Sequence, residues 1–296
     1  MSRVRPGFVG TVVLGAGFLW GGVLLPGLAW GKGDPPGEGP SGAAWRVLEP
    51  GLAYGEFPSP QPADRGDSLV RVLRIDPSSF RFHLLNASAE GEGRALTVRR
   101  WSRKHHLVAA INASMYQTDH RTSVSLMRTA GHINNPRLSR DRSLLAFDRI
   151  DERVAEVKLL DRDCEQLEEW RGRYRTLVQS IRMISCRGRN VWTQQSRKWS
   201  TAAIATDQRG RVLFILVRSP FSTHDLIENL KALPLKIERA MYLEGGPEAQ
   251  MFFESGSLRK KLVGSYETGF NEDDRKTFAW PVPNVIGITR KDTGKN

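Results

Sequence analysis

The sequence has little cysteine. Cys164 and Cys186 are its only two, and they occur without a CxxC motif or a histidine-rich cluster. A structural zinc site, which needs four sulfur or nitrogen ligands at short spacings, is therefore not expected. The even count predicts a disulfide between Cys164 and Cys186 if the chain folds in an oxidising compartment. Two buried free thiols are the alternative, because sequence spacing does not show whether the two Cα atoms come close.

Common catalytic motifs are also missing. The sequence contains no HExxH, no GxSxG and no phosphate-binding P-loop, and His105-His106 lacks another metal ligand at useful spacing. Serine hydrolase and NTPase chemistry depend on such motifs. The sequence gives these classes no support, and it implies no metal and no cofactor.

Acidic residues are in the minority: 32 Asp and Glu stand against 44 Lys and Arg, for a net charge of +12. The arginines are scattered, without the interleaved aromatic residues of a nucleic-acid-binding platform. Nucleic acid is therefore not expected as a partner. The charge is compatible with anionic partners such as phosphate-bearing glycans and lipids, although generic basicity is the simpler explanation.

The N-terminus has the composition of an export signal. Arg3 and Arg5 precede an uncharged apolar run from Phe8 to Trp30, and cleavage after Ala29 would follow the small-x-small rule. The run is also long enough to remain as a membrane anchor. We expect a signal peptide or anchor at 1–30, a Gly/Pro-rich linker at 31–44 and a folded domain at 45–296. The protein is then exported, periplasmic or secreted, and meets the membrane only through an uncleaved N-terminal segment.

Apolar runs and turn residues predict the elements of this domain. The clearest is a hairpin of strands 201–206 and 212–217, joined by the turn Asp207-Gln208-Arg209-Gly210. A helix is expected over 222–233 between a capping-box pattern and Pro234, and a shorter one around 164–174. Further strands are expected at 68–76 paired with 80–85, at 107–111, at 144–147 paired with 154–160, at 240–243 and at 285–289. The order predicts an α+β fold: a single domain with a mixed, largely antiparallel sheet and flanking helices.

Two strand ends carry candidate site residues. Glu244 ends a short buried strand and precedes Gly245 and Gly246, which let backbone approach a ligand closely. A turn-lining acid that only accepts backbone hydrogen bonds is the alternative. Asn112, Ser114 and Tyr116 follow another buried strand, where alternation points them to one face. They can bind phosphate or sugar oxygens, or they serve only in caps and turns.

Other candidates are weaker. His224 lies in the first turn of the expected helix, where backbone amides favour anions, but a plain cap position is equally compatible. Gln179, Ser180 and Arg182 follow an apolar pair, and an arginine there suits phosphate, although a surface arginine is the simpler reading. Gln250, which follows the Glu-Gly-Gly turn, completes the substrate-binding candidates.

Taken together, these segments resemble a known family. The matching stretches are INASMY at 111–116, VQSIRMI at 178–184, STAAIATDQRGRVLFILV at 200–217, the helix STHDLIENL and MYLEGGPEAQMFF at 241–253. Their order resembles the phosphodiester glycosidase domain family, bacterial relatives of the lysosomal uncovering enzyme that removes N-acetylglucosamine from a sugar phosphodiester. The resemblance covers roughly residues 68–288.

The resemblance implies an exported hydrolase that cleaves sugar-phosphate diester bonds in envelope or exopolysaccharide glycans. Glu244 corresponds to the aspartate of the family's Asp-Gly-Gly turn. Glu244 and His224 are the expected catalytic residues, with His224, Arg182 and Asn112 orienting the phosphate. The family arginine is missing at Ser200-Thr201, where Arg197 and Lys198 lie slightly upstream. This departure motivates an alternative function, a non-catalytic binder of anionic glycans.

Overall fold

The computed structural model describes residues 45–291, which belong to one compact unit spanning Pro40–Asn296. The expected signal or anchor at 1–30 and the linker at 31–44 lie outside the described residues. Within 45–291, no helix is both long and apolar enough to cross a membrane.

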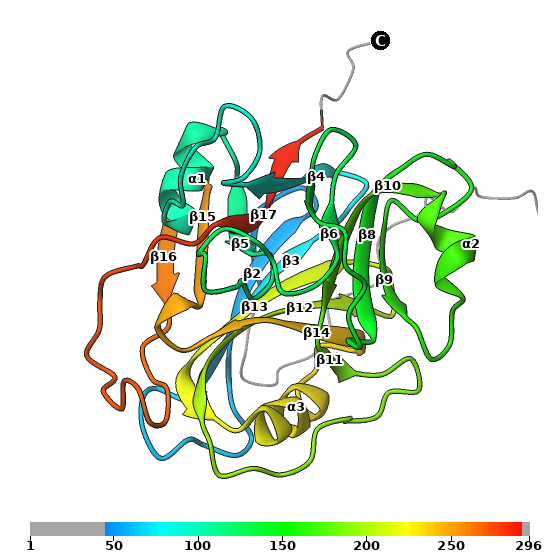
Figure 1. Ribbon diagram of the computed structural model, residues 1–296. Coiled ribbons are helices and arrows are strands. Elements are labelled where there is room, and N and C mark those ends of the chain that lie inside the picture. Colours follow the sequence, from blue (N-terminus) through cyan, green and yellow to red (C-terminus); the bar gives the residue numbers. More distant parts are fainter. Residues whose placement is uncertain (1–44, 292–296) are drawn as a thin grey trace, which may run out of the picture. The chain divides into compact units, whose positions relative to one another are not determined.

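The described residues form three sheets, and every pairing between their named strands is antiparallel (Figure 1). The largest sheet has seven strands in the order β1-β2-β3-β13-β12-β14-β11. Its strands are β1 (Arg46–Glu49), β2 (Leu52–Pro58), β3 (Leu69–Ile75), β13 (Val212–Phe221), β12 (Trp199–Asp207), β14 (Ile237–Gly245) and β11 (Arg182–Ile184).

Two smaller sheets have five strands each. One contains, in spatial order, β7 (Ile133–Asn135), β6 (Met127–Arg128), β10 (Tyr174–Ser180), β8 (Ser143–Arg149) and β9 (Val157–Asp161). The other contains β16 (Leu258–Val263), β15 (Gln250–Ser255), β5 (Ala109–Asn112), β17 (Asn284–Arg290) and β4 (Phe80–Asn86).

Helices are few and short in this part of the chain. They are α1 (Val98–Lys104), α2 (Leu167–Arg171), α3 (Thr223–Ala232) and the 3-10 turn η1 (Gly246–Glu248). The Ser222 side chain accepts a hydrogen bond from the Asp225 amide and so caps α3, as the capping-box pattern predicted. The second predicted helix is shorter than expected, because Cys164 lies in the turn before α2.

The seven-stranded sheet is buried on both faces. Phe214 and Leu216 of β13 belong to the main core, which also contains residues of both smaller sheets. Ile215 and Val217, which point the other way, pack in a second cluster that includes Leu226 of α3. In Figure 1, α3 accordingly lies on the side of this sheet away from the two smaller sheets. Burial on both faces explains the uninterrupted apolar run of β13.

Most predicted elements are confirmed, with corrections to their arrangement. The 201–217 hairpin forms as β12 and β13, and β8 pairs with β9. The predicted partner of 80–85 is wrong: β4 pairs with β17, since β2 and β13 already occupy both edges of β3. The predicted antiparallel pairing is confirmed, but the expected mixed sheet is wrong, because the strands form three sheets and all their named pairings are antiparallel. Apolar strands in different parts of the chain bury their faces against one another in three separate sheets.

Candidate active site

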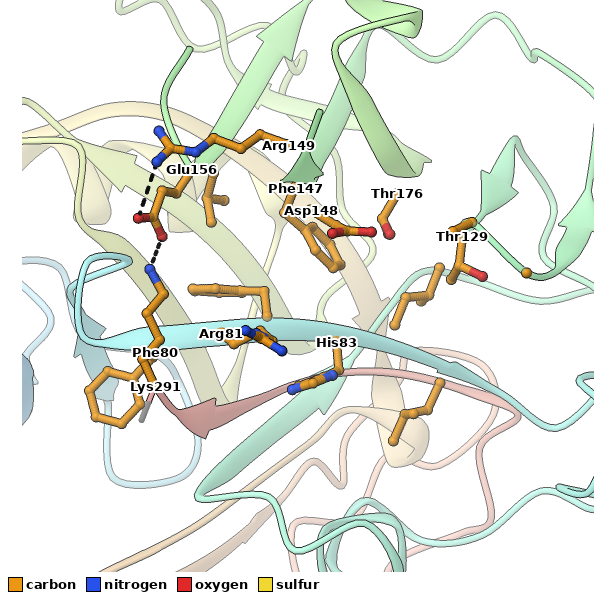
Figure 2. A pocket seen from close by; sticks show the side chains of 16 residues that line it. Phe80, Arg81, His83, Thr129, Phe147, Asp148, Arg149, Glu156, Thr176 and Lys291 are labelled. Atoms are coloured by element: carbon orange, nitrogen blue, oxygen red, sulfur yellow. Dashed lines mark hydrogen bonds and ion pairs between the residues drawn. The ribbon is translucent and has the colours of Figure 1, made fainter. Parts of the chain in front are cut away.

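Two cavities of similar size open on this fold. One, of about 620 Å³, lies beside β4 and β8, and Figure 2 shows Arg81 and His83 on its lower wall. Its Glu156 carboxylate is paired with Arg149 (3.7 Å) and Lys291. The other, of about 600 Å³, is lined by Tyr116 and by the Glu-Gly-Gly turn at the end of β14. This second cavity, the candidate catalytic cavity, gathers predicted site residues from separate strands.

A β-bulge positions Glu244 at the cavity. On β12, Ala202 is aligned with Glu244 and the next residue, Ala203, with Tyr242, so Leu243 is an extra residue on β14. Bulges of this kind redirect side chains and are common beside active sites. Leu243 is buried in the main core, whereas Tyr242 and Glu244 both line the cavity.

The two glycines after Glu244 are required by space. A Cβ atom on Gly245 would collide with the hydroxyl of Tyr242 and would lie 3.1 Å from Trp199 Cδ1. Gly246 has a φ of +58°, and a Cβ atom there would lie 2.5 Å from a carboxylate oxygen of Glu267. These positions permit only the smallest residue, because any side chain would enter the cavity wall.

Three carboxylates line the cavity: Glu244, Glu248 and Glu267. Burial, together with repulsion from Glu248 and Glu267, raises the pKa of Glu244 to about 8, although the Gly245 amide donates to Glu244 Oε1 at 3.1 Å and acts in the opposite direction. Burial also raises the pKa of Glu248, against the attraction of Lys276. Glu244 therefore changes its charge near neutral pH, which suits a general acid or base.

Aromatic side chains form much of the wall. Trp192, Trp199, Tyr116 and Tyr242 all line the cavity, and the Trp192 and Tyr242 ring centroids lie 6.2 Å apart. Burial raises the pKa of the Tyr242 hydroxyl far above its usual range, and nearby carboxylates add to this effect. Burial also raises the pKa of the Tyr116 hydroxyl, so both tyrosines stay protonated as hydrogen-bond donors. Aromatic faces and a few polar groups are the usual lining of a small-molecule site.

The cavity also has one arginine. Arg197 lines it, with its side chain 63% exposed and 3.7 Å from Glu267. Ser200 and Thr201, where the family arginine was expected, are buried. The Ser200 hydroxyl accepts hydrogen bonds from the amides of Ser265 and Tyr266 at 3.0 and 3.2 Å. The cavity's arginine thus comes from the segment before β12, and it is paired with Glu267.

Asn112 and Gln250 lie behind the turn. The Asn112 side chain donates to the carbonyl of Glu248 at 3.0 Å and accepts from the amide of Gln250 at 2.7 Å. The Gln250 side chain donates to the carbonyls of Glu248 and Trp280 at 3.3 and 2.6 Å. Both are buried, so they hold the chain that carries Glu248 and do not face the cavity.

Ser114 and the last two residues of β10, Gln179 and Ser180, are buried. The Ser114 hydroxyl donates to the carbonyl of Gln179 at 3.2 Å. The Gln179 amide group donates to the carbonyls of Ser139 and Asp141, and the buried Ser180 hydroxyl has no hydrogen-bond partner among the described residues. None of the three lines the candidate catalytic cavity.

Arg182 and His224 have other partners. Arg182 forms ion pairs with Asp161 (2.6 Å) and Asp163 (2.7 Å). His224 Nδ1 lies 3.3 Å from Asp225 at the start of α3. Neither residue lines the candidate catalytic cavity, so the structure does not bring them to Glu244.

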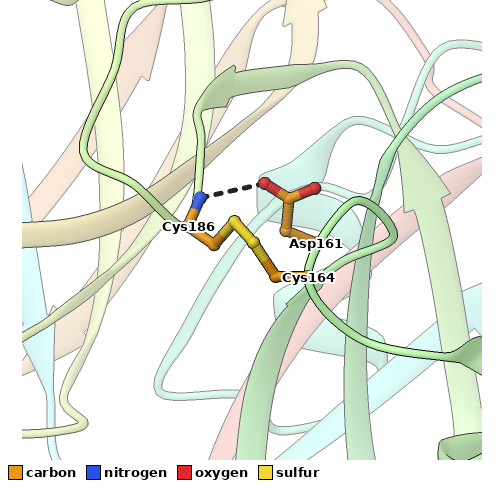
Figure 3. A group of neighbouring side chains, drawn as sticks. All are labelled: Asp161, Cys164 and Cys186. Carbon is orange, nitrogen blue, oxygen red and sulfur yellow. Dashed lines mark hydrogen bonds between the residues drawn. A yellow bond between two sulfur atoms is a disulfide. The ribbon is translucent and has the colours of Figure 1, made fainter.

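Cys164 and Cys186 form the expected disulfide, with Cα atoms 6.6 Å apart (Figure 3). Asp161 lies beside it and accepts from the Cys186 amide at 2.9 Å. Because the sulfur atoms are bonded to each other and Asp161 is paired with Arg182, these groups act as a structural cluster here.

Sequence reasoning missed several cavity residues. Trp192, Trp199, His120, Glu248 and Glu267 all line the cavity. Trp192 and Trp199 lie in an otherwise polar stretch, VWTQQSRKW, where exposed tryptophan would be unusual, and that contrast was the available signal.

Comparison with known proteins supports the fold. The catalytic domain of zebrafish N-acetylglucosamine-1-phosphodiester alpha-N-acetylglucosaminidase, auto-inhibited by its pro-peptide, has a TM-score of 0.55 at 13% identity, covering 85% of this chain and 87% of that one. A hypothetical protein from Synechocystis has a TM-score of 0.52 at 11% identity, covering 85% of this chain and 64% of that one. At these identities the likeness concerns the fold alone. No curated protein matches this chain.

A family model gives the assignment. The model of the phosphodiester glycosidase family matches residues 105–289, well over half of the 296-residue chain. The matched region includes β5, the aromatic wall and the whole Glu-Gly-Gly turn. The chain therefore belongs to the phosphodiester glycosidase family.

Proposed function

We propose that this protein is an exported hydrolase that cleaves the bond between a sugar's anomeric carbon and a phosphate oxygen in envelope or exopolysaccharide glycans. The observation that carries the proposal is Glu244, a carboxylate of raised pKa beside a two-glycine turn in an aromatic-walled cavity. Membership of the phosphodiester glycosidase family supports the reaction class.

The chemistry assigns Glu244 a base or nucleophile role. A phosphate leaving group is already weakly basic, so it departs without a proton from the protein. The step that needs help is attack on the anomeric carbon, through a transition state with positive charge on the sugar ring. The ionised Glu244 carboxylate either activates a water or attacks directly. A pKa near the working pH gives a base that is both strong and available.

The other cavity residues fit parts of such a substrate. The rings of Trp192 and Trp199 offer apolar faces on which a sugar ring can pack. Arg197 is the arginine of the cavity, and its guanidinium group can bind two phosphate oxygens at once. It would take the role of the family arginine, which this chain lacks at Ser200-Thr201. Glu248 and Glu267 place negative charge around the ring, which favours the oxocarbenium-like transition state.

An exported location agrees with one structural feature. The Cys164–Cys186 disulfide is of the kind that persists in oxidising compartments outside the cytoplasm. The expected signal peptide or anchor at 1–30 would deliver the chain there, to the periplasm or beyond.

The direct test is release of free sugar from an N-acetylglucosamine phosphodiester by the purified protein. Glu244→Gln keeps the shape of the side chain and removes its charge, so we expect turnover to fall by about 100-fold or more. Glu238→Gln is the matched control, because Glu238 is exposed on the same strand. Equal turnover by wild type and Glu244→Gln would refute the catalytic role. Folded wild type that binds the anionic glycan but releases no sugar would favour the non-catalytic binder.

A further inference from the structure

A basic and aromatic surface adjoins the candidate catalytic cavity. Two hollows, of about 480 and 310 Å³, lie along the loop that joins β16 to β17, and Phe278 lines both of them. In Figure 1 this loop runs along the side of the molecule that carries β16 and α1. We call the two hollows together the basic track.

The track is connected to the cavity by backbone. Lys276, which lines the first hollow, donates to the carbonyl of Pro247 at 2.7 Å, inside the turn that carries Glu248. The carbonyl of Glu267, a cavity residue, accepts from the amides of Phe270 and Asn271 at 3.1 and 2.9 Å. Phe270 and Asn271 both line the first hollow. The loop that forms the first hollow is therefore bonded to the wall of the cavity.

The first hollow combines rings with cations. Lys276 Nζ lies 4.0 Å from the ring centroid of Trp280 and 5.2 Å from that of Phe278. Phe270 and Phe278 are 63% and 62% exposed, which is unusual for rings of this size unless they contact a partner. Asp273 is the carboxylate that lines this hollow, and Arg275 pairs with it at 2.8 Å.

The second hollow is strongly basic. Arg99, Arg100 and Arg103 of α1 line it together with Lys261 of β16. Within residues 45–291 none of the three arginines forms an ion pair, and the buried Nε of Arg99 has no hydrogen-bond partner. Glu254, the acid near Arg99 and Arg103, is itself bound by Arg259. Unpaired guanidinium groups held close together attract phosphate.

We propose that the basic track binds further repeats of a phosphodiester-linked, polyanionic glycan while one of its bonds lies in the catalytic cavity. This inference rests on the proposed function. The first hollow offers rings on which sugars can pack, and the second offers guanidinium groups that can bind phosphates. The track is hollowed and its loop is bonded to the cavity wall, which suits a flexible chain better than a flat lipid surface. The enzyme then acts on polymer in preference to a single diester.

The test compares a short and a long substrate. The short one is a phosphodiester that joins the anomeric oxygen of one N-acetylglucosamine to a methyl group. The long one is a polymer of N-acetylglucosamine linked by phosphodiesters. Arg100→Glu/Arg103→Glu should lower kcat/KM for the polymer about tenfold and leave the short diester unchanged. Both arginines are exposed, so the fold should persist. Phe278→Ala is a second variant without charge change and should act in the same direction.

The matched control is Arg187→Glu/Arg189→Glu, which changes net charge equally in an exposed loop away from the track. An equal loss in this control would overturn the inference, as would unchanged polymer turnover in the track variants.

Polymer binding measured without turnover separates the two proposals. If wild type releases no sugar but binds polymer, and Arg100→Glu/Arg103→Glu does not, the track stands and the hydrolase proposal fails. Binding to anionic phospholipid vesicles but not to polymer would overturn the track's assignment to a glycan.

Discussion

The side-chain amide of Asn112 donates to the backbone carbonyl of Glu248 at 3.0 Å, and so joins two segments that lie 136 residues apart in the sequence. The same side chain accepts from the amide of Gln250 at 2.7 Å. Asn112, at the end of β5, thus binds the backbone on both sides of Ala249, the residue that follows η1. The Glu-Gly-Gly turn is held by the five-stranded sheet that contains β5, although Glu244 itself belongs to the seven-stranded sheet.

Asn112→Ala should lower both stability and turnover. The change leaves the Glu248 carbonyl and the Gln250 amide without their partner, at a cost of about 1–3 kcal/mol for buried groups. We expect kcat to fall more than KM rises, because the turn loses its position and the aromatic wall remains. Thermal unfolding and steady-state kinetics measure the two effects.

Asn229→Ala is the control for this prediction. Asn229 is equally buried and binds the backbone of Gln61 through two hydrogen bonds of 2.8 and 3.1 Å, and neither residue lines the cavity. It should lose similar stability and keep its kcat. A comparable kcat loss in both variants would mean that general destabilisation, and not the position of the turn, explains the Asn112 effect.

The pH dependence of kcat/KM should identify the active form of Glu244. Burial and two neighbouring carboxylates raise its pKa to about 8. If the ionised form is the base or nucleophile, kcat/KM rises with pH and levels off above about 8. Glu244→Gln should remove this rise from any residual activity. A rate that falls through the same range would make Glu244 a general acid and contradict the assigned role.

The same pKa predicts that Glu244 destabilises the fold at alkaline pH. Its carboxyl has a pKa of about 8 in the folded protein and about 4.5 in the unfolded chain, so between these values the folded state holds the proton more tightly. Unfolding then releases a proton, and stability falls as pH rises from about 4.5 to 8. The penalty is of the order of a few kcal/mol once the group is charged.

Glu244→Gln should therefore have a Tm close to wild type at pH 5 and a higher Tm at pH 9. Catalytic groups often reduce stability in this way. Glu238→Gln, on the exposed end of the same strand, is the matched control and should not gain the Tm difference that burial of Glu244 predicts. Calorimetry across this pH range measures the two Tm values. A Tm of Glu244→Gln that falls relative to wild type as pH rises would contradict the raised pKa of Glu244.

Sequence patterns predicted elements whose partners are close in the chain. The turn between β12 and β13 contains Gly210 at φ +76°, a conformation that favours glycine, so the hairpin and its position were readable locally. The partner of β4 could not be predicted from the local sequence, because alternation shows which face of a strand is buried and not which strand lies alongside it. That partner, β17, is at the far end of the described chain.

The candidate site likewise combines features that are local in the sequence with features that depend on distant segments. The Glu-Gly-Gly turn could be singled out because its acid and glycines are adjacent in the sequence. Trp192 and Glu267 come from irregular segments that only tertiary folding brings to the cavity. The signal at Arg182 was ambiguous, since an arginine at a strand edge binds an external phosphate or the protein's own carboxylates equally well. Here it binds Asp161 and Asp163.

Removing the disulfide should cost stability without changing the chemistry. Cys164 and Cys186 are separated by 22 positions, and opening a loop of this size costs about 3 kcal/mol in chain entropy of the unfolded state. For a domain of this size we expect Cys164→Ser/Cys186→Ser to lower Tm by roughly 6–12 °C. Neither cysteine lines the catalytic cavity, so kcat of the folded variant should match wild type.

A reductant separates the crosslink from the substitution itself. Dithiothreitol should lower the Tm of wild type to that of Cys164→Ser/Cys186→Ser and leave the variant unchanged. If the variant is as stable as oxidised wild type, the crosslink does not stabilise the native state. The ion pairs that Arg182 of β11 forms with Asp161 and Asp163 would then suffice to join β9 to β11.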